Sequence, residues 1–138
     1  GSTVSTSGYR NQDYSYNTFC ARVHDLGDPE ILLICGGTND SWAGAPIGEN
    51  KFEGWTSKDL KAFRPAFCYL MHLAKTLYPN ATIVNITNSE LSEDVTAAMA
   101  EICAYYGVPN ILLHDIEKQG GHPSQAGMKA IAEQVPLY

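Results

Sequence analysis

The chain has 138 residues, of which 44% are hydrophobic and 17% are charged, as expected of one globular domain and not of a disordered chain. Its formal net charge is -6 with only nine Lys and Arg residues, which argues against binding to a nucleic acid backbone. No apolar run approaches the roughly 20 residues that cross a bilayer. We therefore expect one soluble domain over residues 1–138 without a membrane span. Its compartment stays open, with export after removal of a signal peptide as one alternative.

The amino-terminal part predicts a helix, a strand and a long loop. Ser, Thr and Gly dominate residues 2–13, which predicts a loop. Apolar spacing predicts a short helix over residues 15–26 that ends at Gly27. The apolar run 31–35 predicts a strand covered on both faces. Residues 36–56 are rich in glycine and aromatic residues and predict a loop, and a loop of this length in a compact domain is usually functional.

The middle of the chain predicts a helix followed by a strand. Thr56 and Asp59 form a capping pattern for a helix that keeps its apolar spacing as far as Leu77. Pro65 is expected to split or kink this helix, because proline has no N–H to donate to the preceding turn. The β-branched segment 82–87 predicts the second strand.

The last part repeats the alternation of helix and strand. Ser92 is expected to cap a helix that Gly107 ends, and a third strand is predicted over residues 111–114. Ser124 is expected to cap the last helix. The buried face of that helix is predicted to carry Met128, Ile131, Ala132 and Val135. Strands that alternate with helices predict an α/β fold with a parallel sheet, although only three strands are predicted, below the usual five or six.

The cysteines have no CxxC spacing and lie within apolar segments, which predicts small buried thiols and neither a zinc site nor a disulfide framework. They are Cys20, Cys35, Cys68 and Cys103.

Two polar residues follow the first predicted strand. The amide of Asn39 lies where it could donate a hydrogen bond to an oxyanion on a substrate carbonyl. The alternative is that Asn39 and Asp40 form a turn in which their side chains bond their own backbone. Asp40 is expected to brace this loop in either case.

His122 is the best candidate for a general base, because it lies in a Gly-rich loop after the third predicted strand and just before a helix. Asp115 is the nearest acid and could orient the imidazole. The alternatives are a surface histidine that caps the helix and an aspartate at the start of a loop. A metal site built on His114 and His122 lacks a third ligand, so we expect no metal and no other cofactor.

The blocks GGTND and GGHPSQAG together resemble the SGNH hydrolase superfamily, also called GDSL esterases and lipases, and more closely the SGNH-like hydrolases of gut bacteria. The resemblance implies a flavodoxin-like three-layer α/β/α sandwich with a parallel sheet. It also implies that Asn39 belongs to the oxyanion hole and that His122 is the general base.

The nucleophile of that superfamily is the Ser of a Gly-Asp-Ser block on the first strand, and this chain has no such block. The resemblance therefore implies that the first strands and the Ser lie upstream of Gly1. Gly1 would match the glycine that adds a second donor to the oxyanion hole, unless it is a tag residue. The superfamily's acid lies three residues before the base, where this chain has Gln119. We therefore expect Asp115, or a backbone carbonyl, to orient His122.

A sheet that lacks its first strands would expose an apolar edge. We expect this edge to pair with an upstream amino-terminal fragment or with a second copy of the chain, and the chain alone to be inactive.

Aromatic residues are expected to border the same edge of the sheet, where flat rings suit stacking on sugars; the alternative is that they pack the long loop onto the domain. They are Tyr9, Tyr14, Tyr16, Trp42, Phe52 and Trp55, with Trp42, Trp55 and Tyr9 the predicted substrate contacts. The sequence thus predicts a serine esterase that removes a small acyl group, such as acetyl, from a carbohydrate or a similar ester. The alternative is a non-catalytic glycan-binding domain or an inactive hydrolase remnant of the same fold.

Overall fold

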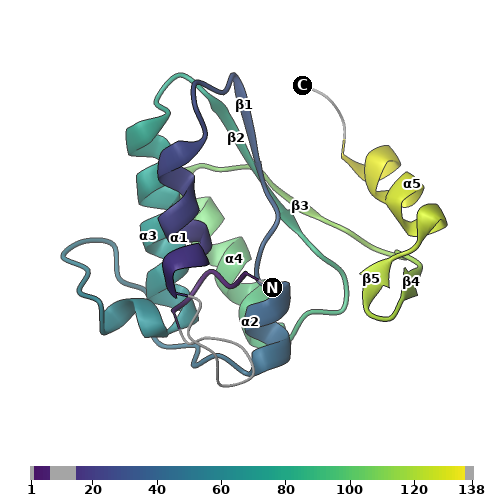
Figure 1. The fold of residues 1–138 in the computed structure, drawn as a ribbon, viewed down its shortest axis with the longest axis horizontal. Helices are drawn as coiled ribbons and strands as arrows, with labels where there is room; N and C mark the ends of the chain where they lie inside the picture. Colours follow the sequence, from purple (N-terminus) through teal and green to yellow (C-terminus); the bar gives the residue numbers. More distant parts are fainter. Residues whose placement is uncertain (1, 7–14, 136–138) are drawn as a thin grey trace.

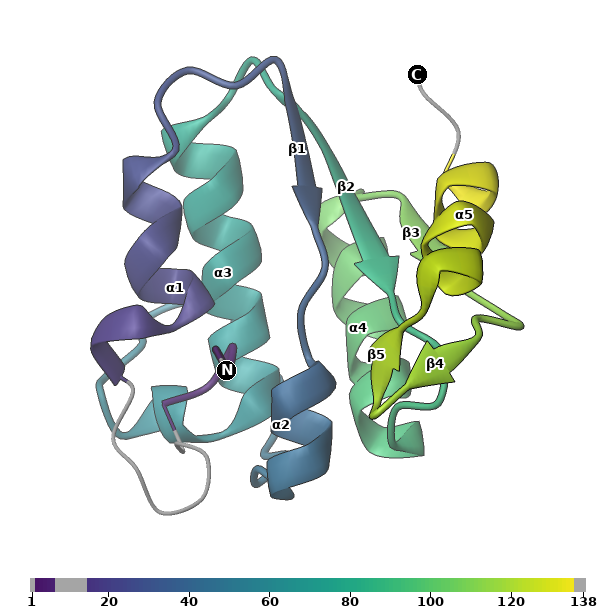
Figure 2. The same cartoon turned by 45° about the vertical axis from the view of Figure 1, so that its right-hand side comes forward.

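The computed structural model describes residues 2–6 and 15–135 and has three layers, α/β/α (Figures 1 and 2). The central sheet contains β1 (Ile31–Ile34), β2 (Thr82–Thr87) and β3 (Asn110–Leu112). All pairs are parallel, and the strand order is β1-β2-β3. One face is covered by α1 (Phe19–Arg22), α3 (Phe63–Leu77) and α4 (Glu93–Tyr106), and the other by α5 (Gln125–Gln134).

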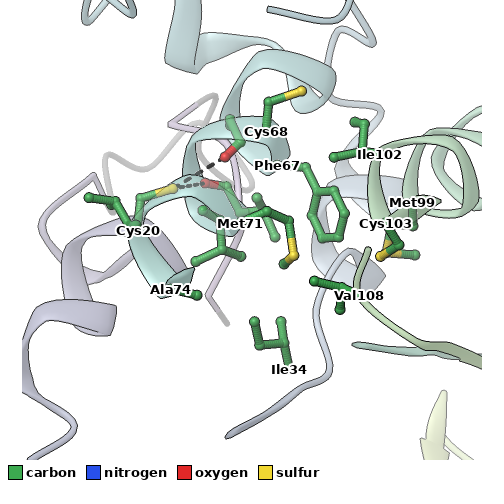
Figure 3. Close-up of a cluster of buried hydrophobic side chains, with 14 of the residues drawn as sticks. Cys20, Ile34, Phe67, Cys68, Met71, Ala74, Met99, Ile102, Cys103 and Val108 are labelled. Atoms are coloured by element: carbon green, nitrogen blue, oxygen red, sulfur yellow. Dashed lines mark hydrogen bonds between the residues drawn. The ribbon is translucent and has the colours of Figure 1, made fainter. Parts of the chain in front are cut away.

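The main core lies between the sheet and the helices α3 and α4. Figure 3 shows Phe67 and Met71 of α3 between Ile34 of β1 and Ile102 and Met99 of α4. These side chains are almost completely buried, and the burial of such apolar groups supplies most of the stabilisation of a fold of this size. A smaller cluster beneath α5 contains Ile86, Leu113 and Ile116, packed against Ile111, Ala130, Ile131 and Val135.

β1 lies at one edge of the sheet, among the residues that the structure describes. It pairs with β2 only. Ile31 is 46% exposed and Leu33 is 50% exposed, because these alternate residues point to the face that α5 covers only in part. The expectation of a strand covered on both faces is therefore wrong for this strand, whereas the expected bare edge is present in the part of the chain described here.

Several helix boundaries follow the predicted caps. The hydroxyl of Ser92 accepts from the N–H of Val95, and Gly107 ends α4 in the left-handed conformation with φ 66°. The hydroxyl of Ser124 likewise accepts from the N–H of Gly127 at the start of α5. The side chains satisfy N–H groups that have no partner within the helix, so these predictions are confirmed.

The helix predicted from Thr56 to Leu77 is split, as expected, but before Pro65. Asp59 accepts from both the N–H and the hydroxyl of Thr56, which starts a short 3₁₀ turn. Ala62 is then extended, and α3 begins at Phe63. Pro65 thus lies in the first turn of α3, where its missing N–H costs nothing.

The buried face predicted for the last helix is partly wrong. Met128 is 57% exposed, and Ala132 is exposed as well. α5 instead packs closely at Gly127 against the connection that follows β3, where an added Cβ would clash with the carbonyl oxygen of Glu117. This close contact turns the helix so that Ala130 and Ile131 face the core.

The region predicted as a loop over residues 36–56 contains a helix, α2 (Thr38–Ala43). Gly37 precedes it with φ 90°, and Gly44 ends it with φ 65°, a conformation that glycine adopts without steric cost. Asn39 and Asp40 therefore lie in the first turn of a helix, and the interpretation of this segment as a turn is wrong. The helix has only six residues, too few for apolar periodicity to reveal it.

The chain has four free cysteines. Cys20, Cys68 and Cys103 are buried as predicted, but Cys35 is exposed, because it follows the last residue of the edge strand β1. Burial raises the pKa of the Cys20 and Cys103 thiols to about 12, so both remain protonated at neutral pH.

Candidate active site

The carboxyl ends of β1 and β2 lead into segments that contact one another. α2 follows β1, and the side-chain amide of Asn88, just after β2, donates to the hydroxyl of Thr38 at 3.3 Å. The hydroxyl of Ser41 accepts from the N–H of Ser92 at 2.8 Å. Open α/β sheets bind their ligands at this end of the strands, so α2 occupies the position where a site is expected.

The side-chain amide of Asn39 is held in one orientation. Its Nδ2 donates a 2.9 Å hydrogen bond to the carbonyl oxygen of Ser2. An amide nitrogen carries two N–H groups, so one N–H is used by Ser2 and the other remains for a further acceptor. Because the carbonyl can accept but not donate, it also decides which end of the amide carries the donors.

Asp40 is buried and joins α2 to the amino-terminal segment. Its carboxylate accepts from the N–H groups of Val4 at 2.8 Å and Ser5 at 3.0 Å, and from the Ser5 hydroxyl at 2.6 Å. Burial raises the pKa of Asp40, and these hydrogen bonds oppose that shift. Asp40 therefore braces the amino-terminal segment against α2, and not the loop for which the sequence predicted a bracing role.

A two-stranded hairpin that the sequence did not predict carries His122. Its strands are β4 (Lys118–Gln119) and β5 (His122–Pro123). Gly120 and Gly121 form the turn with φ values of 58° and 81°. Two consecutive residues with positive φ are the requirement of a type I′ hairpin turn, so this glycine pair fixes where His122 lies.

The hairpin is fastened to the loop after β2 through Lys118. The ammonium group of Lys118 donates to the carbonyl oxygen of Ser89 at 2.8 Å and lies 3.4 Å from the carboxylate of Glu90. Its side chain is only 13% exposed. Lys118 thereby ties the strand before the turn to the end of β2.

His122 and α2 meet through Trp42. The two ring centroids are 6.0 Å apart, and the planes are inclined at 75°, an edge-to-face arrangement. Trp42 follows Asn39 by three residues on the same helix, so both lie on one side of α2. Asn39 of α2 and His122 of β5 are 83 positions apart in sequence. They lie at the same end of the sheet, where Figure 2 shows α2 and the hairpin and where Trp42 contacts His122.

The other predicted site residues lie elsewhere or outside the described residues. The carboxylate of Asp115 contacts the imidazole of His114 at 3.0 Å, with both side chains largely exposed. No contact joins Asp115 to His122 among the described residues, so an orienting role for Asp115 stays a prediction. Gly1 and Tyr9 lie outside the described residues.

Trp55 packs against α3 and not against the hairpin. Its ring lies 5.1 Å from the rings of both Tyr69 and His72, and its indole nitrogen donates to the carbonyl of Lys51. Phe52 also packs against a helix, since its ring stacks on that of Tyr105 of α4 with centroids 3.8 Å apart. These two rings fit the alternative in which aromatic residues pack the long loop onto the domain.

Three supporting residues escaped the sequence analysis: Ser2, Lys118 and Gly121. Ser2 acts through a backbone carbonyl, which no side-chain pattern encodes. Lys118 acts across a long sequence separation. The glycine pair before His122 was the one available signal, since Gly-Gly between short segments is typical of a two-residue hairpin turn.

Within residues 2–6 and 15–135, no group of three or more His, Cys, Asp or Glu side chains is arranged to hold a metal ion. Over the same residues, no helix has the length and apolar content needed to cross a membrane.

The comparisons with known proteins agree with this architecture. The family model for GDSL-like lipases and acylhydrolases matches residues 1–138, so the chain belongs to this family. A GDSL-like lipase from Bacteroides uniformis is 61% identical over 97% of this chain, with a TM-score of 0.95. A GDSL-like lipase from Bacteroides ovatus is 46% identical over 97% of this chain, also with a TM-score of 0.95.

A third structure, from Lactobacillus plantarum, is 20% identical over 96% of this chain and 74% of its own, with a TM-score of 0.78, and supports the fold alone. The chain spans 63% of the length of the Bacteroides uniformis protein and 65% of that from Bacteroides ovatus. The search of curated proteins gave no match. The fold is thus the three-layer sandwich implied by the resemblance to SGNH hydrolases.

Proposed function

We propose that the chain supplies the general base and an oxyanion donor of a serine esterase. The observation that carries the proposal is the helix α2, which bears Asn39 and contacts the ring of His122 through Trp42. A hydrogen-bond donor and an imidazole at the carboxyl end of a parallel sheet are the groups that acyl transfer needs. Membership in the GDSL-like lipase and acylhydrolase family supports the same reaction class.

In this proposal a serine hydroxyl attacks the ester carbonyl while His122 accepts the hydroxyl proton. The N–H of Asn39 that is not bonded to Ser2 donates to the oxyanion of the tetrahedral intermediate, and Gly1 adds a backbone N–H. His122 then returns the proton to the leaving alcohol, and water removes the acyl group by the same two steps in reverse. Asp115 can orient His122 only after its carboxylate turns away from His114.

We further propose that the nucleophilic serine comes from a segment upstream of Gly1 that pairs with the free edge of β1. Support comes from the pairing of β1, which has β2 as its one partner strand among the described residues, and from the exposed Ile31 and Leu33 on its open face, because apolar side chains of a parallel strand are normally covered. The part of each Bacteroides relative that this chain does not cover is also about a third of that relative's length. The competing occupant of the edge is a second copy of the chain.

The proposed substrate is a small acyl ester, such as an acetyl group, on a carbohydrate. Trp42 is 45% exposed, so part of its indole remains open beside His122 for stacking on a sugar face. Tyr9 stays a predicted contact.

A fluorophosphonate probe, which reacts with activated serines, tests the proposal. The product of the whole gene should be labelled and should hydrolyse nitrophenyl acetate, while residues 1–138 alone should do neither. The His122→Gln variant of the whole product should lose labelling, and His24→Gln, an exposed histidine on another element, should keep it. Labelling of residues 1–138 alone would overturn the upstream serine. A whole product that stays unlabelled and inactive would favour a glycan-binding domain or an inactive remnant.

A further inference from the structure

We propose that Trp42 positions the imidazole of His122 and so sets the distance between the general base and the oxyanion donor. The inference rests on the proposed function and deepens it. It assigns Trp42 a role that acts through His122, in addition to any contact with substrate.

Hydrogen bonds hold the backbone of His122 in place, but none holds its side chain among the described residues. β5 pairs with β4, and Lys118 fastens β4 to the end of β2. The imidazole itself makes no hydrogen bond to any residue that the structure describes, and its ring contact is with Trp42. Without a neighbouring ring, an exposed side chain that makes no hydrogen bond would sample several rotamers, so the indole is the group that limits this freedom.

Gly121 allows the indole to come this close. A Cβ added at Gly121 would lie 2.7 Å from Cη2 and 3.0 Å from Cζ2 of Trp42, closer than carbon atoms approach without a shift. The residue before His122 therefore lies directly against the indole. The φ of 81° at Gly121 independently favours glycine there. Glycine at this position is therefore needed both for the hairpin turn and for the close contact with Trp42.

α2 is held by hydrogen bonds on two sides, so a contact from this helix can fix the position of the His122 imidazole. Asp40 fixes it to Val4 and Ser5, and Ser41 fixes it to the start of α4. Asn39 and Trp42 occupy one face of this helix, three residues apart. A helix turn with these anchors places the amide and the indole at a constant separation. Because the indole restrains the imidazole, the base is aligned with the oxyanion donor before substrate arrives.

The kinetic test compares Trp42→Ala with Trp42→Phe in the product of the whole gene, assayed with nitrophenyl acetate. A misplaced catalytic group costs up to roughly 10²-fold in rate, so Trp42→Ala should lower kcat by about 10- to 100-fold with KM nearly unchanged. Trp42→Phe keeps an aromatic edge and should recover most of kcat. Trp55→Ala, which removes an indole packed on α3, is the matched control and should keep kcat. A rise in KM at constant kcat would overturn the proposal in favour of a substrate contact alone.

A second test requires no activity and therefore separates this inference from the proposed function. The Hα–Hβ coupling constants of His122, measured by NMR, report its χ1 rotamer. They should indicate one rotamer in the wild type and in Trp42→Phe, and an averaged population in Trp42→Ala. Gly121→Ala should also average them, because the added Cβ displaces the indole without removing it. Couplings that stay unchanged in Trp42→Ala would overturn the positioning role even if the enzyme is active. If the wild type proves inactive, the proposed function fails, and the couplings still decide the role of Trp42.

Discussion

Asn39 donates one N–H of its side-chain amide to the carbonyl oxygen of Ser2 at 2.9 Å. This contact links the first turn of α2 to the first described residue of the chain. It also leaves the second N–H of the amide in a defined direction, which is what preorganised stabilisation of an oxyanion requires. The proposed site thus depends on a backbone carbonyl as much as on the side chain that it orients.

Asn39→Ala should lower kcat of the whole gene product by about 10²- to 10³-fold, the usual effect of removing one oxyanion donor. KM should change little, because the lost hydrogen bond forms mainly in the transition state. Steady-state kinetics with nitrophenyl acetate measure both constants. Asn80→Ala, at an exposed position before β2, is the control. Equal activity of Asn39→Ala and wild type would remove Asn39 from the mechanism.

Asp40→Asn should destabilise the fold by about 2–3 kcal/mol. The amide that replaces the carboxylate turns a donor group toward two N–H groups and a hydroxyl, and leaves buried polar groups unpaired. Urea denaturation followed by circular dichroism measures the loss. Asp28→Asn, at an exposed position, should change stability by less than about 0.5 kcal/mol. A stable Asp40→Asn variant would show that the amino-terminal segment is held by other contacts.

The stability difference between wild type and Asp40→Asn should depend on pH. Burial raises the pKa of Asp40 in the folded state, so the folded protein binds a proton that the unfolded chain has already released. The contribution of Asp40 to stability is therefore complete below the unfolded pKa and declines as the pH rises through the folded pKa. Urea midpoints should be measured from neutral to mildly acidic pH. The difference between the midpoints of the wild type and Asp40→Asn should increase as the pH falls. If this difference instead decreased as the pH falls, the effect of the hydrogen bonds on the pKa of Asp40 would outweigh the effect of burial.

Trp55→Ala should lower the free energy of unfolding by about 1–3 kcal/mol, since the half-buried indole packs on Tyr69 and His72. It should leave KM for an acetylated sugar unchanged, because the ring lies against α3. Thermal denaturation and steady-state kinetics check the two halves of this prediction. An increase in KM with stability unchanged would instead support the substrate contact predicted from the sequence.

Leu33→Lys should reduce self-association of residues 1–138, because a charge at the open side of β1 opposes edge-to-edge pairing. Sedimentation velocity over a range of concentrations measures the effect. Leu77→Lys, which alters an exposed leucine at the end of α3 and outside the sheet, is the matched control and should associate like the wild type. A wild type that stays monomeric at every concentration would argue against a second copy at this edge.

The sequence predicted the strands and the capped helices well because their signals are local. Ser92, Ser124 and Gly107 act on neighbouring backbone groups, and apolar runs mark β1 and β2. It missed α2, whose six residues are shorter than two turns and are flanked by glycines that resemble a loop. It also missed the hairpin, whose strands have only two residues each.

The placement of side chains within the candidate site was harder to predict than the location of that site in the fold. Asn39 and His122 follow strands, and the ends of parallel strands meet at one edge, so their common location followed from topology. Whether Trp42 or Trp55 lies beside His122 depends on how the loop after α2 folds over α3, a long-range contact that no local pattern contains. Cys35 is exposed for a similar reason, since its burial depends on what covers the edge strand.

Val4 and Ser5 are buried and support α2 from inside the domain. Their N–H groups donate hydrogen bonds to the buried carboxylate of Asp40, on the helix that also carries Asn39 and Trp42. Removal of residues 1–5 would leave that carboxylate without these donors and would also remove the Ser2 carbonyl that orients the amide of Asn39.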